Sequence, residues 1–336
     1  MTSRRHFIES TAALGGLALS SRAAFAQSTP ANVRVIFFGV ASNLPIWCGI
    51  TKGFFAKENL NVTTEITPSS VYMFEHLNSG DFDIAITAMD NVVAYDEGQG
   101  ATNLKNPADF VAFMGGDSGM LTLWSRPDIH TYSDLKGTTI AVDAVQTGFT
   151  FVLRRILELA GLNEGDYQLA PAGGTPKRYA ALTGSAQYSA ALLTPPFDLE
   201  ADAKGYHKLA TALDLIGNYQ AYTGVARREW MNQNGDVLVR YIRGYLAALR
   251  WLYDGRNKNE TIAILTKQGN VPPEVASLVY GEVIDRQYGI VPNGAIDLAG
   301  VRTVLDLRSR YGIPKKTLKN PMKYVDESYW RRALRR

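Results

Sequence analysis

The sequence has only one cysteine, Cys48, in 336 residues. A single cysteine excludes an intramolecular disulfide and any zinc or iron–sulfur site that needs several thiolates. The four histidines, His6, His76, His130 and His207, are scattered singly, without the spacing of a metal site. We therefore predict that the protein uses neither a metal ion nor another cofactor.

Long hydrophobic runs are also missing. No stretch reaches the roughly 18–20 uninterrupted apolar residues that a membrane-spanning helix needs, so we expect no membrane insertion of the mature chain. The formal net charge is only +3, which gives the protein little excess charge with which to attract nucleic acid. A phosphate-binding loop of the G-x-x-x-x-G-K-[ST] type is absent, since residues 173–177 have the wrong spacing.

The N-terminus combines three export features in order. Residues 3–8, SRRHFI, resemble the twin-arginine motif, residues 11–19 are small and apolar, and residues 24–26 form an A-x-A cleavage pattern. We predict a twin-arginine signal peptide over residues 1–26, cleaved after Ala26, and export to the periplasm. The alternative is an amphipathic leading helix whose arginines face water. Removal of the segment, which carries three arginines and one glutamate, would lower the net charge from +3 to +1.

Beyond residue 26, short β-rich runs alternate with helical patterns. Eight runs are short, apolar and bounded by turns: residues 33–38, 62–66, 84–87, 110–114, 121–124, 139–142, 167–169 and 188–193. The clearest helix covers residues 149–160 and is followed by Gly161. This alternation predicts βαβ units and a mostly parallel sheet. From Asp236 onward the pattern is helical.

Eight sequence segments occur in a characteristic order. They are VRV (33–35), LP (44–45), KGFFAKE (52–58), LNSGDFDIA (77–85), DLKGTTIAV (134–142), RYAALTG (178–184), LTPP (193–196) and YVDESY (324–329). Together they resemble the nitrate/sulfonate/taurine-type periplasmic solute-binding proteins of ABC importers. That superfamily also contains the thiamine-pyrimidine synthases of fungi.

The resemblance implies a two-lobed periplasmic-binding-protein (type II) fold. Each lobe is expected to hold a mostly parallel sheet flanked by helices, with two hinge crossovers near residues 115–121 and 218–224. The first lobe would combine residues 27–118 with 221–336, and the second would comprise residues 119–220. The resemblance further implies a non-enzymatic monomer that binds a small molecule and delivers it to an ABC permease and its ATPase.

The candidate site follows from where strands end. In open α/β sheets, ligands lie beyond the carboxyl ends of the strands, where helix N-termini offer unpaired N–H donors. The predicted ligand-binding residues are Ser42, Asn43, Trp47, Ser69, Asp90, Asn91, Thr147, Gly148, Phe149, Gly173, Gly174, Thr175 and Thr194. The loops at Thr147–Phe149 and Gly173–Thr175 are favoured most, because glycine permits close approach and a helix N-terminus favours negative charge.

Several of these residues have an equally plain structural interpretation. Trp47 would pack in the lobe core, Asn43 and Asp90 would cap helices, and Thr194 would belong to a simple turn. An available Asp90 carboxylate would also oppose a ligand with several negative charges. We therefore expect a small organic monoanion, aromatic or otherwise compact, rather than an inorganic oxyanion.

Two other functions stay open at this point. One is an exported enzyme on the same scaffold, although the cysteine-rich segment of the fungal synthases cannot be supplied by one cysteine. GDSG (116–119) resembles a protease nucleophile segment, but the strongly β context and partner histidine are missing. The other is a periplasmic ligand sensor, which would use the same clamp.

Overall fold

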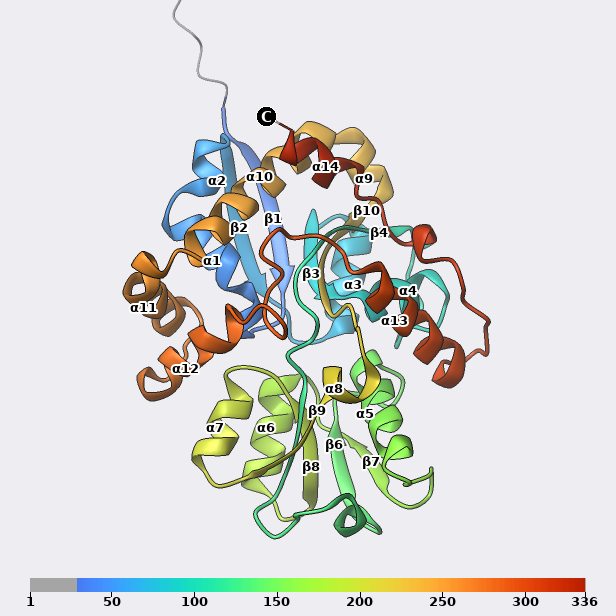
Figure 1. The fold of residues 1–336 in the computed structure, drawn as a ribbon. Helices are drawn as coiled ribbons and strands as arrows, with labels where there is room; N and C mark the ends of the chain where they lie inside the picture. Colours follow the sequence, from blue (N-terminus) through green and yellow to red (C-terminus); the bar gives the residue numbers. More distant parts are fainter. Residues whose placement is uncertain (1–28, 336) are drawn as a thin grey trace, which may run out of the picture.

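The computed structural model describes residues 29–335, and these residues form two lobes, one above the other in Figure 1. The predicted signal peptide over residues 1–26 lies outside the described residues, so its cleavage stays a prediction. Among residues 29–335, no helix combines the length and apolarity needed to cross a membrane.

The first lobe is built on a five-stranded sheet with the order β2-β1-β3-β10-β4. Its strands are β1 (Ala31–Phe37), β2 (Leu60–Ile66), β3 (Ile84–Ala88), β4 (Phe110–Gly115) and β10 (Tyr222–Arg227). β1 pairs in parallel with β2 and β3, whereas β10 is antiparallel to both β3 and β4. Four strands therefore run in one direction. β10 is reversed because it carries the chain back from the other lobe, between β3 and the edge strand β4, which leads the chain out to that lobe.

The second lobe repeats this plan with the order β7-β6-β8-β5-β9. Its strands are β5 (Thr122–Ser125), β6 (Thr139–Val142), β7 (Gln168–Pro171), β8 (Tyr188–Leu193) and β9 (His207–Thr211). β6 is parallel to β7 and β8, and β5, the first strand after the crossover, is antiparallel to β8 and β9. The two-lobed α/β fold is thus confirmed, with one reversed strand in each otherwise parallel sheet.

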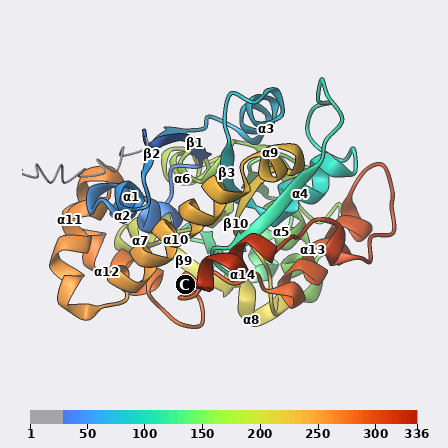
Figure 2. The same cartoon turned by 90° about the horizontal axis from the view of Figure 1, so that it is seen from above.

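Helices cover both sheets (Figures 1 and 2). The first lobe contains α1 (Leu44–Thr51), α2 (Phe54–Lys57), α3 (Ser70–Ser79), α4 (Met89–Asp96), α9 (Arg228–Gln233), α10 (Gly235–Leu252), α11 (Lys258–Gln268), α12 (Pro273–Val283), α13 (Leu298–Tyr311) and α14 (Ser328–Leu334). The second contains α5 (Gly148–Leu159), α6 (Thr175–Gly184), α7 (Phe197–Ala203) and α8 (Ala212–Ile216). Figure 2 shows the C-terminal part of the chain, orange to red, running along one side of the molecule from α11 to α13.

The eight predicted strands are all present, with small shifts at their ends. Helices α1 and α2 are separate, because Gly53 between them takes a left-handed conformation (φ 69°) that ends the first helix. Helix α5 begins within one residue of its predicted start and ends before Gly161, which is also left-handed (φ 83°).

The chain passes between the two sheets twice, from β4 to β5 and from α8 to β10. These passages fall within the predicted crossovers near residues 115–121 and 218–224. Their action as hinges, and the division into residues 27–118 with 221–336 and residues 119–220, stay predictions. The lobes are also in contact through helices, since α13 of the first lobe packs against α5 of the second.

Candidate ligand-binding site

A pocket of about 210 Å³ lies between the lobes, and we call it the glycine-loop pocket because the loops 143–148 and 172–175 form its second-lobe wall. Nine of the thirteen predicted residues line it: Ser69, Asp90, Asn91, Thr147, Gly148, Phe149, Gly173, Gly174 and Thr175. The carboxyl ends of β1, β3, β6 and β7 all lead into this region, so the rule for open α/β sheets places these residues together.

The two second-lobe loops bring helix N-termini to the pocket. Thr147 precedes α5, and its hydroxyl donates a hydrogen bond to the Asp143 carboxylate at 2.5 Å. Gly173 precedes α6 in a left-handed conformation (φ 102°), where a side chain would be strained. The first turns of both helices leave backbone N–H groups without helical partners, and such groups favour an anionic ligand.

Asp90 is bound by an arginine from a distant part of the chain. Both oxygens accept hydrogen bonds from Arg308 of α13, from Nε at 2.6 Å and from Nη2 at 2.5 Å. The two side chains are 2% and 1% exposed, and Arg308 also donates to the backbone oxygens of Gln99 and Gln146. The Asp90 charge is therefore compensated by a bidentate ion pair. Asp90 is therefore not the free carboxylate that would oppose a ligand with several negative charges.

The lobes touch where Gly148 meets Asp90. A Cβ atom at position 148 would lie 2.3 Å from the Asp90 carboxyl carbon, well inside van der Waals contact. Only glycine lets the start of α5 approach the first turn of α4 this closely. Gly148 thus shapes the contact between the lobes as well as the pocket wall.

The pocket also contains a buried arginine that the prediction of site residues missed. Arg178 lies in α6, is 2% exposed and lines the pocket. It donates to the backbone oxygens of Leu192 (3.0 Å) and Gly173 (3.2 Å) and to the Thr175 hydroxyl (3.0 Å), all neutral acceptors. Burial lowers the pKa of Arg178, while the charge of Asp143 opposes that shift. Arginine stays protonated nonetheless, so the pocket wall carries a buried positive charge without a contacting carboxylate.

The sequence gives only a weak signal for Arg178. It opens the RYAALTG segment, just after the predicted loop at Gly173–Thr175. Arginine is rarely buried unless it is paired, so an arginine one turn into a helix is normally assigned to the surface. Arg178 is buried because β8 and the loop before α6 pack around it, and these contacts are formed only in the folded protein.

Four predicted residues do not line the pocket: Ser42, Asn43, Trp47 and Thr194. Asn43 is fully buried and its Nδ2 donates to the backbone oxygens of Phe38 and Val40. Trp47 packs edge-on against Phe37 in the core. Ser42 and Thr194 are buried too. Trp47 therefore agrees with its structural interpretation, whereas Asn43 stands at the N-cap position of α1 without making a capping hydrogen bond. Ligand contact by any of the four stays a prediction.

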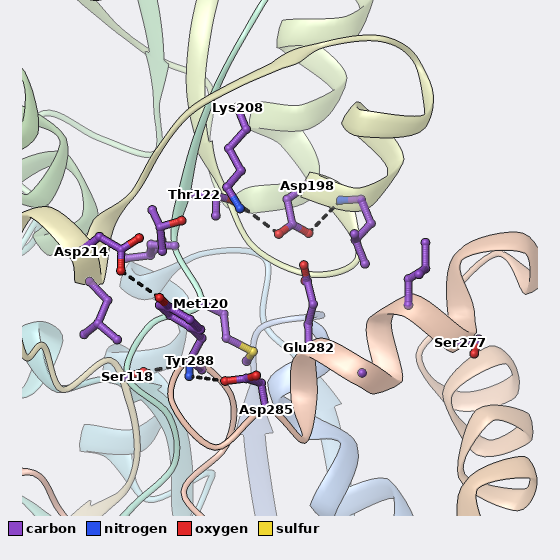
Figure 3. Close-up of a pocket in the computed structure, with 16 residues that line it drawn as sticks. Ser118, Met120, Thr122, Asp198, Lys208, Asp214, Ser277, Glu282, Asp285 and Tyr288 are labelled. Carbon is purple, nitrogen blue, oxygen red and sulfur yellow. Dashed lines mark hydrogen bonds between the residues drawn. The ribbon is translucent and has the colours of Figure 1, made fainter.

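A larger cavity, of about 590 Å³, also lies between the lobes. We call it the carboxyl cavity because Asp198, Asp214, Glu282 and Asp285 line it together with Lys208 (Figure 3). Its volume exceeds that of the glycine-loop pocket, but its lining is acidic and it contains none of the thirteen predicted residues. The glycine-loop pocket, by contrast, combines a buried cation with two helix N-termini.

The single cysteine and the histidines within residues 29–335 lie outside the linings of both cavities. Cys48 is fully buried in α1, and burial raises the pKa of its thiol to about 12, so it supplies no thiolate near neutral pH. His130 and His207 lie close together, but neither lines the two cavities. Within residues 29–335, no three His, Cys, Asp or Glu side chains are grouped to hold a metal ion.

A family model described as NMT1/THI5 like matches residues 41–256. A search of the curated proteins found no match. Among solved structures, the periplasmic nitrate-binding protein NrtA from Synechocystis PCC 6803 is similar with a TM-score of 0.74 and 16% identity, covering 90% of this chain and 88% of that one.

Two further solved structures show the same fold. The alkanesulfonate-binding protein SsuA from Xanthomonas axonopodis pv. citri, bound to MOPS, has a TM-score of 0.69 and 18% identity, covering 89% of this chain and 99% of that one. The desulfurization enzyme DSZB has a TM-score of 0.63 and 13% identity, covering 90% and 99% of the two chains. At such low identity these likenesses establish the periplasmic-binding-protein fold alone.

Proposed function

The chain belongs to the NMT1/THI5-like family, whose model covers nearly two thirds of it, and we propose that it is the periplasmic solute-binding component of an ABC importer. In this proposal the two lobes close on a small organic anion and present it to a membrane permease, whose ATPase drives uptake. The mature chain acts as a monomer and reaches the periplasm through the signal peptide predicted over residues 1–26.

The observation that carries this proposal is Arg178 in the wall of the glycine-loop pocket. A buried guanidinium bound only by neutral oxygens is costly unless an anion arrives to compensate it. It has five N–H donors, and three are used by Leu192, Gly173 and Thr175. An anion entering between the lobes would gain the remaining donors as well as the N-terminal N–H groups of α5 and α6.

The size of the pocket favours a compact ligand. A volume of about 210 Å³ is below the roughly 300 Å³ at which drug-sized ligand pockets begin. Phe149 and Tyr222, which meet edge to face with ring centroids 6.4 Å apart, give the pocket an apolar side. A small carboxylate or sulfonate with an organic body fits both the charge and this wall.

A thermal-shift screen against small carboxylates, sulfonates, aromatic acids and pyrimidines tests the proposal. A solute at 100 times its Kd should stabilise the protein by about 2.7 kcal/mol. Calorimetry of the compounds that respond then gives the ligand class. Tight binding of nitrate or sulfate, with no response to organic acids, would contradict the proposed ligand.

An exported enzyme on the same scaffold is the second candidate, since DSZB shares the fold and is an enzyme. It would have to work without Cys48, whose thiol is buried and protonated. A ligand that is recovered unchanged after incubation supports binding, whereas a product that accumulates over time supports catalysis. A sensor would bind the same ligand but would not depend on a permease for its function.

A further inference from the structure

The carboxyl cavity brings together two acidic side chains from different lobes. Asp198 lies in the first turn of α7 in the second lobe, and Glu282 lies in the last turn of α12 in the first lobe. The two helices pack against each other. Figure 3 shows the Glu282 carboxyl group pointing toward that of Asp198. Any motion that separates the lobes at this point must separate these two groups.

The surroundings of the pair disfavour its fully charged form. Asp198 is 3% exposed, and its oxygens accept hydrogen bonds only from neutral donors, the Leu199 N–H at 2.9 Å and the Thr122 hydroxyl at 3.3 Å. Glu282 lies near the C-terminus of its helix, where the helix dipole is negative. Burial and then the charge of Asp198 raise the pKa of Glu282 to about 8. Burial also raises the pKa of Asp198.

The other charged groups near the pair sum to a net negative charge. Lys208 on β9 is the one cation among the described residues that line the cavity. Asp214 on α8 and Asp285 after α12 also line it, and Asp202 on α7 contributes its charge to Glu282. The Tyr288 hydroxyl donates to Asp214 at 2.9 Å. One lysine cannot neutralise these carboxylates together with a doubly charged Asp198–Glu282 pair, so the pair keeps a proton near neutral pH.

We propose that Asp198 and Glu282 form a proton-dependent contact between the lobes, which holds them together while the pair shares a proton and separates them once both groups are charged. With the lobes apart, Glu282 faces water and titrates at its ordinary pKa of 4.5. The closed form therefore binds more protons than the open form, and acid favours closing. The equilibrium constant for closing falls by up to about tenfold per pH unit between about pH 5 and about pH 8. Above about pH 8 it no longer changes with pH.

The consequence for ligand release rests on the function proposed above, but the contact itself does not depend on a ligand. X-ray solution scattering of the ligand-free protein, at constant ionic strength from about pH 5 to about pH 9, tests it directly. We expect the radius of gyration of the wild type to rise with pH and that of Glu282→Gln to stay at the compact value, since the amide cannot ionise.

Asp285→Asn is the matched control, because it removes one negative charge from the same cavity while both Asp198 and Glu282 can still ionise. It should follow the wild type. If Glu282→Gln does not fold, Asp198→Asn takes its place, since an asparagine oxygen still accepts from the Leu199 N–H. A wild-type radius that does not change with pH, or a pH response that persists in the variant, overturns the proposal. Failure of the proposed function has a different signature: no solute compacts the protein, while its pH response is intact.

Discussion

Replacing Arg308 with methionine tests how much the buried ion pair with Asp90 contributes to stability. Both side chains are almost fully buried and are joined by two short hydrogen bonds. The variant leaves the Asp90 carboxylate buried without its partner. Breaking such a pair on one side costs about 3–5 kcal/mol, because the remaining charge has lost water without gaining compensation. Arg308 also donates to the backbone oxygen of Gln146 in the second lobe. Part of the lost stability therefore comes from the contact between the lobes.

Arg310→Met is the matched control for this experiment. It removes an arginine from the same helix, but Arg310 is 56% exposed and its partner Glu158 is 24% exposed. Exposed pairs of this kind contribute at most about 1 kcal/mol. Urea unfolding followed by circular dichroism measures both variants against the wild type. A cost for Arg308→Met no larger than that of Arg310→Met would refute the interpretation.

Three other outcomes follow from the structure and from the predicted signal peptide. Arg178→Gln should weaken binding of the carboxylate found in the screen by about tenfold or more, as measured by calorimetry. Lys177→Gln removes a charge at the exposed rim and should change the affinity less than about threefold. Equal effects of the two variants would remove Arg178 from the site. Gly148→Val should weaken binding because its side chain collides with the facing carboxylate, whereas Gly184→Val, which has open space around it, should not. Replacing both arginines of the twin-arginine motif with lysine should block export, since an ammonium does not reproduce the guanidinium fork; mature protein in the periplasm at normal amounts would contradict the motif.

The sequence pattern predicted what depends on local order. The eight strands that were predicted are apolar runs bounded by turn residues, and the loops that follow them are positioned by the sheet itself. Two strands were missed. β9, with the sequence HKLAT, is half polar, and β10, YTGVAR, contains a glycine and ends in arginine. Neither has the apolar signal of a buried strand, and both are fixed by pairing with strands far away in the sequence.

The contacts that define the site depend on long-range pairing, which a single sequence does not encode visibly. Asp198 and Glu282 lie on helices of different lobes, and neither position shows that the two meet. Arg178 has the sequence environment of a surface helix residue, and it is buried because β8 and the loop before α6 close around it. In each case the chemistry follows from tertiary packing that brings separate elements together.

Asp90 shows how this affects the choice of ligand. The sequence allows two interpretations of this residue, a helix cap or a free acceptor that would repel a polyanion. In the structure it is neither, because Arg308, 218 residues later, holds both of its oxygens. A monoanion stays our prediction, now on a different basis. Arg308 compensates the charge of Asp90, and Arg178 has only neutral hydrogen-bond acceptors, so one buried positive charge is left for an incoming ligand. A monoanion neutralises that charge, whereas a second negative charge on the ligand would have to be buried without a partner.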